Sequence, residues 1–203
     1  MRTELAAVLQ PLLTRRSSPV LHAPGPTDAE LEALLHAAAT VPDHGALRPW
    51  RFVVVAGDAR TAFGEALAAA AAEHEPDVSP AVLDRIRSKA FLAPALIAVA
   101  ARVTVGKVPE WEQVASASCA GYAITLAAHQ LGLGAIWKSS PFHDGAALRA
   151  TLDLAPADRF LGWVNVGSVS AEREVVARPA SDLGLIARRL SPDGTPEPFR
   201  GAG

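Results

Sequence analysis

The sequence is short of several residue types, and each shortage excludes a class of protein. Cys119 is the only cysteine among 203 residues, which excludes an internal disulfide and a multi-cysteine zinc site. That usage fits a reducing compartment, and we expect a cytoplasmic protein. The net charge is −2 and the pI is near 6.3, so no basic field exists to attract nucleic acid or anionic lipid. A small molecule or another protein is the expected partner.

No stretch of the sequence has both the length and the side chains of a membrane span. Residues 115–137 carry no formal charge, but they are mostly Ala, Ser and Gly, and Gly132 and Gly134 end the helix early. Residues 1–18 contain polar interruptions and end near two arginines, unlike a secretory signal. We therefore expect no membrane association. The uncharged helix should be buried, either centrally or against a partner subunit.

Side chains for metal or nucleophilic chemistry are also scarce. The six histidines include no pair at metal-ligand spacing, and no G-x-S-x-G motif occurs. Cys119 lies within the apolar helix, which favours a packed thiol over a nucleophile. We expect no metal site and no catalytic side chain. A bound cofactor would then supply any chemistry.

Hydrophobic periodicity and capping residues predict a single α+β domain over residues 1–203. Thr27 and Glu30 form a capping-box pattern before a helix that should end ahead of Pro42. The other expected helices cover 3–14, 58–74, 79 onward, 109–131 and 144–152. The expected strands are 51–56, 95–103, 135–138 and 160–166, after which Gly167 should break the pattern. Residues 168–203 should form an irregular, proline-rich extension, either loose or laid across another subunit.

Two segments pair a cation with hydroxyl groups next to apolar elements. Arg15-Arg16-Ser17-Ser18 follows the first helix, and Trp137-Lys138-Ser139-Ser140 follows a short strand. The first segment fits a solvated basic helix end, since cations are favourable there. It also fits a phosphate clamp, because each charge-assisted hydrogen bond contributes about 1.5–3 kcal/mol. Neither segment is a P-loop or a complete dinucleotide fingerprint, so a bound phosphate would belong to another kind of ligand.

Four motifs, in this order, resemble the FMN-dependent nitroreductase superfamily, and most of all its small YdjA-like members. They are Arg-Arg-Ser at 15–17, Ala-x-x-x-Pro-Asp-His at 38–44 followed by Pro-Trp-x-Phe at 49–52, Val-Pro-x-Trp-Glu-Gln at 108–113 and Trp-Lys-Ser at 137–139. The resemblance covers about four fifths of the chain. It implies a nitroreductase-like fold, with a central mixed or antiparallel sheet flanked by helices, in an intertwined homodimer.

The same resemblance implies two FMN sites at the subunit interface, each built from both chains. NADH or NADPH would reduce the flavin at N5, and a nitroaromatic, quinone or similar acceptor would then take its place in a ping-pong cycle. By position in the motifs, one chain would supply Arg15, Arg16, Ser17, Trp137, Lys138 and Ser139. The other would supply Thr40 and His44, and Arg48 would border the substrate pocket.

Four positions depart from the family pattern, and two of these departures, the missing lysine and Thr40, keep a second function open. Thr40 and Lys138 stand where YdjA-like proteins have arginine, and Arg48 stands where they have glutamine. The lysine that larger members carry after Arg-x-Ser is absent from Ser18-Pro19-Val20. Lysine offers a point charge without the bidentate fork of arginine. The alternative is therefore a protein that binds, stores or senses FMN without efficient turnover.

Overall fold

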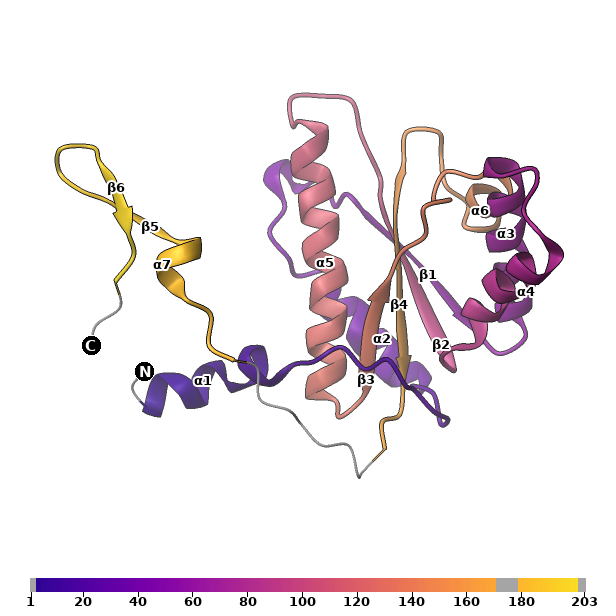
Figure 1. Ribbon diagram of the computed structural model, residues 1–203, viewed down its shortest axis with the longest axis horizontal. Helices are drawn as coiled ribbons and strands as arrows, with labels where there is room; N and C mark the ends of the chain where they lie inside the picture. The colour runs from indigo at the N-terminus through magenta and orange to yellow at the C-terminus, as the bar shows by residue number, and fades with distance from the viewer. Residues whose placement is uncertain (1–2, 171–178, 201–203) are drawn as a thin grey trace. The chain divides into compact units, whose positions relative to one another are not determined.

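The computed structural model describes residues 3–170 and 179–200 (Figure 1). The chain divides into two compact units, residues 1–173 (unit 1) and 174–203 (unit 2). All four sequence motifs lie in unit 1.

Unit 1 is built on a four-stranded antiparallel sheet. Its strands are β1 (Trp50–Ala56), β2 (Ala95–Ala101), β3 (Gly134–Lys138) and β4 (Arg159–Gly167), in the order β1-β2-β4-β3. Each neighbouring pair is antiparallel. Every residue of β2 is buried, as expected for an apolar strand covered on both faces. The α+β class is confirmed, and the central sheet is antiparallel.

Helices cover both faces of this sheet (Figure 1). One face carries α2 and α5, and the other carries α3, α4 and α6, as the two clusters of buried side chains also indicate. The helices of unit 1 are α1 (Thr3–Thr14), α2 (Asp28–Ala38), α3 (Ala59–His74), α4 (Pro80–Ser88), α5 (Glu110–Gln130) and α6 (Ala146–Thr151). Two short 3-10 helices are η1 (His44–Ala46) and η2 (Lys89–Phe91).

Each face has its own hydrophobic core. On the α3 side, Phe63 meets Trp163 edge to face with ring centroids 5.5 Å apart. On the α5 side, Leu34 and Ile124 pack with Val164 of β4, and all three are fully buried. Burying a side chain of this size stabilises the fold by about 1.5–3 kcal/mol. The two cores hold the sheet between its helices and fix the strand ends that carry the candidate site.

Local predictions at the element ends had mixed outcomes. The Thr27–Glu30 capping box is confirmed, with both reciprocal hydrogen bonds present. The helices predicted over 58–74 and from 79 onward have Asp58 and Ser79 at their N-cap positions, but neither side chain caps its helix. The expectation that Gly167 ends the strand pattern was wrong, because Gly167 is the last residue of β4 and pairs with β3. A Cβ there would lie 2.7 Å from Pro94 Cδ, so close packing explains this glycine.

Of the two alternatives predicted for α5, central burial does not hold within the single chain, and burial against a partner subunit stays a prediction. Trp111 and Tyr122 are 69% and 43% exposed, and the Cys119 thiol is exposed rather than packed. They share one side of the helix, whereas Ala117, Ala120 and Ile124 face the core. One side of this helix, formed by Trp111, Ala115, Cys119 and Tyr122, is therefore exposed in the single chain, and we call it the α5 stripe. Among the described helices, none is long and apolar enough to cross a membrane.

Unit 2 is a short helix followed by a hairpin. The helix α7 (Leu183–Ile186) precedes β5 (Arg188–Leu190) and β6 (Pro196–Pro198), which pair antiparallel. No described residue of unit 2 is buried within the single chain, and Leu185 and Ile186 are 75% and 71% exposed. The stretch expected to be irregular thus contains a hairpin but, in the described residues, no core of its own. Residues 171–178, which begin the predicted extension, lie outside the described residues.

Candidate functional site

The fold brings the two cation-bearing segments to one edge of the sheet. The backbone N–H of Ser18 donates to the carbonyl of Ala135 on β3, at 2.9 Å. Further along, Leu21 and Ser18 flank Gly134, where a Cβ would lie 2.5 Å from Leu21 Cδ2. The segment after α1 therefore runs beside β3, the edge strand that ends at Lys138. Residues more than 100 positions apart in sequence share one surface.

The two arginines at this edge have different surroundings. The guanidinium of Arg15 lies over the ring of Tyr122, 5.7 Å from its centroid, in cation–π geometry. Arg16 donates from Nη1 to the carbonyls of Leu13 and Arg15, at 2.8 and 2.9 Å. Arg16 thus caps the C-terminal end of α1, in line with the basic-helix-end interpretation. Neither arginine forms an ion pair within the described part of the chain.

At the end of β3, Trp137 and Lys138 point to opposite faces of the strand, as successive strand residues do. The indole of Trp137 packs on Gly121 of α5, and its Nε1–H donates to the carbonyl of Leu161 at 3.0 Å. A Cβ at residue 121 would lie 2.3 Å from that ring. Trp137 is therefore fixed by α5. Lys138 is partly buried and Ser139 is exposed.

Gly162 shapes the backbone beside Lys138. Its φ is +103°, and a Cβ would lie 2.1 Å from the Lys138 carbonyl oxygen. The pairing of β2 with β4 shifts register between Val99 and Ala100, opposite this position. Bulges of this kind often re-aim a strand next to a site. Only glycine allows the end of β3 to approach β4 this closely.

The predicted partner-side residues lie elsewhere in the chain. Thr40 follows α2 and is exposed, and its hydroxyl donates to the carbonyl of Ala37 at 2.8 Å. His44 lies in η1, and its Nδ1 is 2.6 Å from Oε2 of Glu112 on α5. The loop between them is fastened to α5, because Ser116 Oγ donates to the carbonyl of Pro42 at 2.6 Å.

Arg48 lies on the same loop and is exposed. Its φ of +50° is unusual for a residue other than glycine. Its backbone N–H donates to Oδ2 of Asp43, at 2.6 Å, which stabilises this turn. The arrangement places a guanidinium on the surface of the loop that carries His44. The loop before β1, which contains proline and glycine, is therefore held in a defined conformation by hydrogen bonds.

Within one chain, α5 separates the two groups of predicted residues. The loop of His44 contacts α5 at positions 112 and 116, whereas Trp137 contacts it at position 121. At about 100° per residue, position 121 lies roughly half a turn around the helix from the other two. The contact of Arg15 with Tyr122 lies about 15 Å along the axis from Glu112. Within one chain, the two groups therefore lie on different sides of α5.

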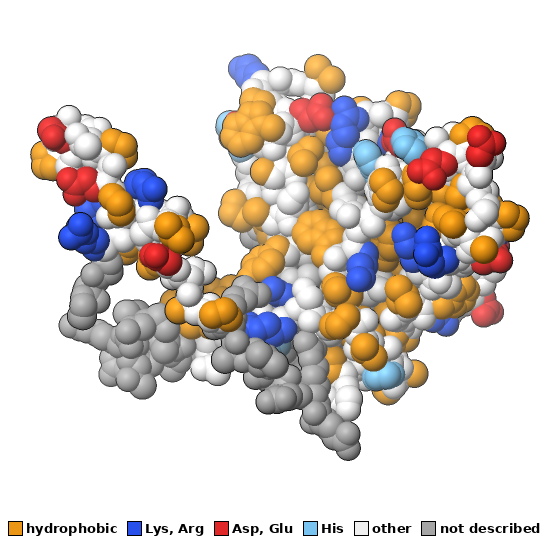
Figure 2. All heavy atoms as spheres, in the orientation of Figure 1, with side chains coloured by type: hydrophobic (Ala, Val, Ile, Leu, Met, Phe, Trp, Pro, Cys, Tyr) orange, Lys and Arg blue, Asp and Glu red, His pale blue; other side chains and the backbone are white. Residues whose placement is uncertain are grey.

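The uncovered stripe of α5 lies between these two groups. Trp111, Ala115, Cys119 and Tyr122 are all exposed and recur every three or four residues. Figure 2 shows hydrophobic side chains at the surface over the α5 side of unit 1. Leu9, Leu12 and Leu13 on α1, which contacts α5 through the Thr14–His129 hydrogen bond, add 39–47% exposed side chains. We call the two groups of predicted residues half-sites: one lies at the edge of β3, and the other is the loop that carries Thr40 and His44. The two half-sites thus flank an apolar surface.

Sequence reasoning did not identify Glu112, Gly121, Tyr122 or Gly162 as parts of this region. Glu112 belongs to the Val-Pro-x-Trp-Glu-Gln motif at 108–113, so this motif could have indicated a role for it. The contacts of Gly121 and Gly162 depend on close approach in three dimensions. Among the described residues, no group of three or more His, Cys, Asp and Glu side chains could hold a metal ion.

Comparison with known proteins shows that the chain belongs to the nitroreductase family. The model of the nitroreductase family matches residues 12–168. A protein of Haemophilus influenzae, provisionally named NAD(P)H nitroreductase, is 37% identical over 167 residues, covering 80% of this chain and 90% of that protein. YdjA of Escherichia coli K12, with the same provisional name, is 34% identical over 161 residues, covering 79% and 87%.

Solved structures agree on the fold. A nitroreductase-like protein from Bacillus cereus has a TM-score of 0.72 at 24% identity, covering 85% of this chain and 91% of that one. A nitroreductase with bound FMN from Bacteroides fragilis has a TM-score of 0.66 at 20% identity, covering 86% and 94%. The predicted resemblance to the nitroreductase superfamily and to YdjA is therefore confirmed. The residue roles predicted from it remain predictions.

Proposed function

We propose that this protein is an FMN-dependent oxidoreductase that uses NADH or NADPH to reduce nitroaromatic, quinone or similar electron-poor acceptors. The observation that carries the proposal is the separation of two predicted half-sites by α5, on either side of an uncovered apolar stripe. Such an arrangement suits a ligand held between two copies of the chain. The relatives and the FMN-bound solved structure support FMN as that ligand.

The edge of β3 fits an FMN phosphate. Arg15, Arg16 and Lys138 form no ion pair with any described acidic side chain, so their charges are available to an anion. Ser17 and Ser139 are exposed beside them and carry hydroxyl donors. Guanidinium groups suit phosphate oxygens, and each charge-assisted bond contributes about 1.5–3 kcal/mol. We assign the phosphate and ribityl end of FMN to this edge.

A second copy of the chain would complete the site. In a two-fold symmetric pair, the same surface of both subunits meets, so the α5 stripe would pack on its counterpart. Thr40 and His44 of each subunit, on the far flank of α5, could then reach the phosphate edge of the other. The exposed Leu185, Ile186 and Leu190 of unit 2 also suit burial against a partner. We propose this homodimer as the functional form.

When bound, FMN would supply the hydride chemistry, accepting from NAD(P)H and passing reducing equivalents to the acceptor in alternation. The residues of the chain bind and orient it. Trp137, locked between Gly121 and the Leu161 carbonyl, gives the edge a fixed wall. Arg48, on the exposed loop, would border the acceptor pocket. No side-chain acid or base is required.

The direct test of binding is titration of FMN into the flavin-free protein, comparing Arg15→Ala with wild type. We expect at least tenfold weaker binding, from the loss of one charge-assisted contact. Arg85→Ala removes an exposed guanidinium from α4, on the opposite side of the sheet, and should leave the affinity unchanged. Equal affinity for wild type and Arg15→Ala would reject the phosphate assignment.

A flavin store or sensor is the second candidate. Its supporting observation is Thr40, a short side chain that donates to the Ala37 carbonyl at a position where the family resemblance implies an arginine. One cation would then be missing on that side of the flavin. Anaerobic mixing with NADH or NADPH separates the candidates. Rapid bleaching of the yellow colour supports the enzyme, and a flavin that stays oxidised supports the store.

A further inference from the structure

We propose that Glu112 is a positioning residue of the FMN site, acting through His44. This inference rests on the proposed function, because it assumes that His44 reaches the flavin bound to the other subunit. The assignment of His44 came from motif resemblance, whereas that of Glu112 comes from the geometry of one contact. Glu112 would hold the imidazole in one orientation and one tautomer before any ligand arrives.

The contact defines which ring nitrogen is left for a ligand. Nδ1 of His44 lies 2.6 Å from Oε2 of Glu112. An ionised carboxylate only accepts hydrogen bonds, so Nδ1 must carry the proton. The Nε2 atom of the same ring then remains for another partner. The His44 side chain is 68% exposed and that of Glu112 only 26%. Glu112 is therefore held against the protein, and the imidazole of His44 faces outward, where a ligand can reach it.

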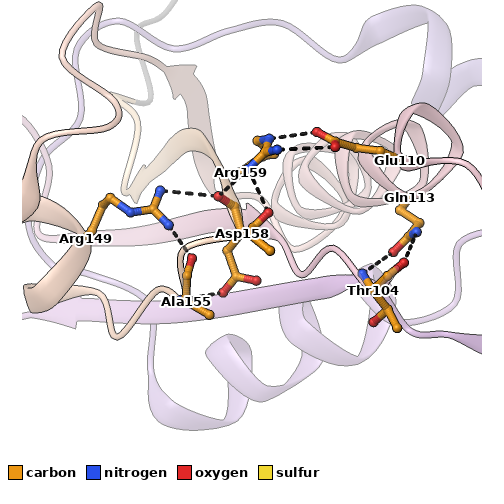
Figure 3. A network of polar contacts seen from close by, with 8 residues as sticks. Thr104, Glu110, Gln113, Arg149, Ala155, Asp158 and Arg159 are labelled. Carbon is orange, nitrogen blue, oxygen red and sulfur yellow. Dashed lines mark hydrogen bonds and ion pairs between the residues drawn. The ribbon is translucent and has the colours of Figure 1, made fainter. Parts of the chain in front are cut away.

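The start of α5, which carries Glu112, is fixed on both sides (Figure 3). The side-chain amide of buried Gln113 accepts from the N–H of Thr104 and donates to the carbonyls of Thr104 and Val108, each within 3.0 Å. On the other side, Arg159 forms a two-point ion pair with Glu110, at 2.7 and 3.2 Å. Glu112 thus projects from a helix end that cannot shift easily.

The backbone of the His44 loop is held by other contacts. Ser116 Oγ fastens the carbonyl of Pro42 at 2.6 Å, and Asp43 accepts from the backbone N–H of Arg48. Gly45, with a φ of +79°, lies against Val108, where a Cβ would be 3.2 Å from Cγ2. Removing the Glu112 carboxylate should therefore free the imidazole while leaving the loop in place. That separation makes a positioning role testable.

A second histidine–glutamate pair in the chain provides a matched control. Nε2 of His36 lies 3.4 Å from Glu32 on α2, one turn away in the same helix. Both side chains are largely exposed, at 79% and 75%. An exposed pair of this kind contributes little, and neither residue belongs to the proposed site. Glu32→Ala therefore reports any general effect of losing a surface carboxylate beside a histidine.

The test is a double-mutant cycle on FMN affinity, measured by flavin fluorescence with Glu112→Ala, His44→Ala and the double variant. We expect Glu112→Ala to weaken FMN binding by about three- to tenfold, and to have no further effect once His44 is alanine. Glu112→Gln, whose amide oxygen can still accept from Nδ1–H, should keep most of the affinity. Glu32→Ala should match wild type.

Nitrogen NMR of the His44 ring adds a readout that needs no flavin. Wild type should show a proton on Nδ1, and Glu112→Ala should show a mixture of tautomers. Failure of wild type to bind FMN would overturn the proposed function and this inference with it. Unchanged affinity of Glu112→Ala, in a protein that binds FMN, would overturn this inference alone. So would equal weakening in the His44→Ala background.

Discussion

Gly162→Ala should damage both the fold and the candidate site. At Gly162, φ is +103° and an added Cβ would lie 2.1 Å from the Lys138 carbonyl oxygen. The unfavourable backbone conformation costs about 1–3 kcal/mol for alanine. Relieving the overlap, which involves backbone and no movable side-chain end, costs about 1–3 kcal/mol more. The sum, about 2–6 kcal/mol, is a large part of the 5–15 kcal/mol of a typical domain.

Urea unfolding followed by tryptophan fluorescence measures this loss as a lower midpoint at an unchanged slope. Gly132→Ala is the matched control, because Gly132 has a φ of +75° and nothing within 4 Å of the added Cβ. Gly132→Ala should cost only the left-handed conformation, about 1–2 kcal/mol. The larger loss in Gly162→Ala than in Gly132→Ala reports mainly the close approach to Lys138. Equal losses would refute the geometry described for the end of β3.

Three further predictions concern the scaffold. Gln113→Ala should lower the free energy of unfolding by about 2–4 kcal/mol in urea titrations, since three backbone groups lose their partner; exposed Gln130→Ala should change it by less than about 0.5 kcal/mol. Leu34→Ala empties a fully buried position and should cost about 2–5 kcal/mol in the same assay; a loss below about 1 kcal/mol would contradict the packing. Hydrogen bonds from Thr27, its backbone N–H first, hold the pKa of Glu30 below its usual value. The contribution of Glu30 is therefore present above the unfolded-state pKa and lost as the pH falls through the folded-state pKa. Thr27→Ala removes the hydroxyl donor and keeps the backbone N–H, so it should raise the pKa of Glu30 only part of the way toward its usual value in a carbon NMR titration. An unmoved pKa would exclude the contribution of the hydroxyl.

Elements governed by local chemistry could be predicted from the sequence. The Thr27–Glu30 box starts α2, and the β-branched run after Trp50 forms β1, because these signals act within a few residues. The two cation segments could also be located from the sequence, because they are defined by their residue types, and their role as an anion site stays a prediction. Their meeting at one sheet edge depends on β3 pairing beside β4, which the sequence pattern alone does not specify.

Features set by long-range contact could not be predicted. The exposed stripe of α5 is uncharged and largely apolar, like its buried face, so polarity could not separate the two faces. The contact between His44 and Glu112 joins residues 68 positions apart. Gly162 looks like any other glycine until the carbonyl of Lys138 is placed beside it. In each case, the sequence does not specify which backbone segment or helix face lies against which other segment in the folded chain.

The central claim is that one site draws residues from two chains, and a mixed dimer tests it most directly. One chain carries Arg15→Ala and the other His44→Ala, with different tags to isolate the mixed pair. If each site takes Arg15 from one chain and His44 from the other, one site of the mixed dimer has both substitutions and the other site has neither. The account predicts one tightly bound FMN per mixed dimer, although both parent variants bind weakly. Two equally weakened sites, with no tight FMN, would contradict it.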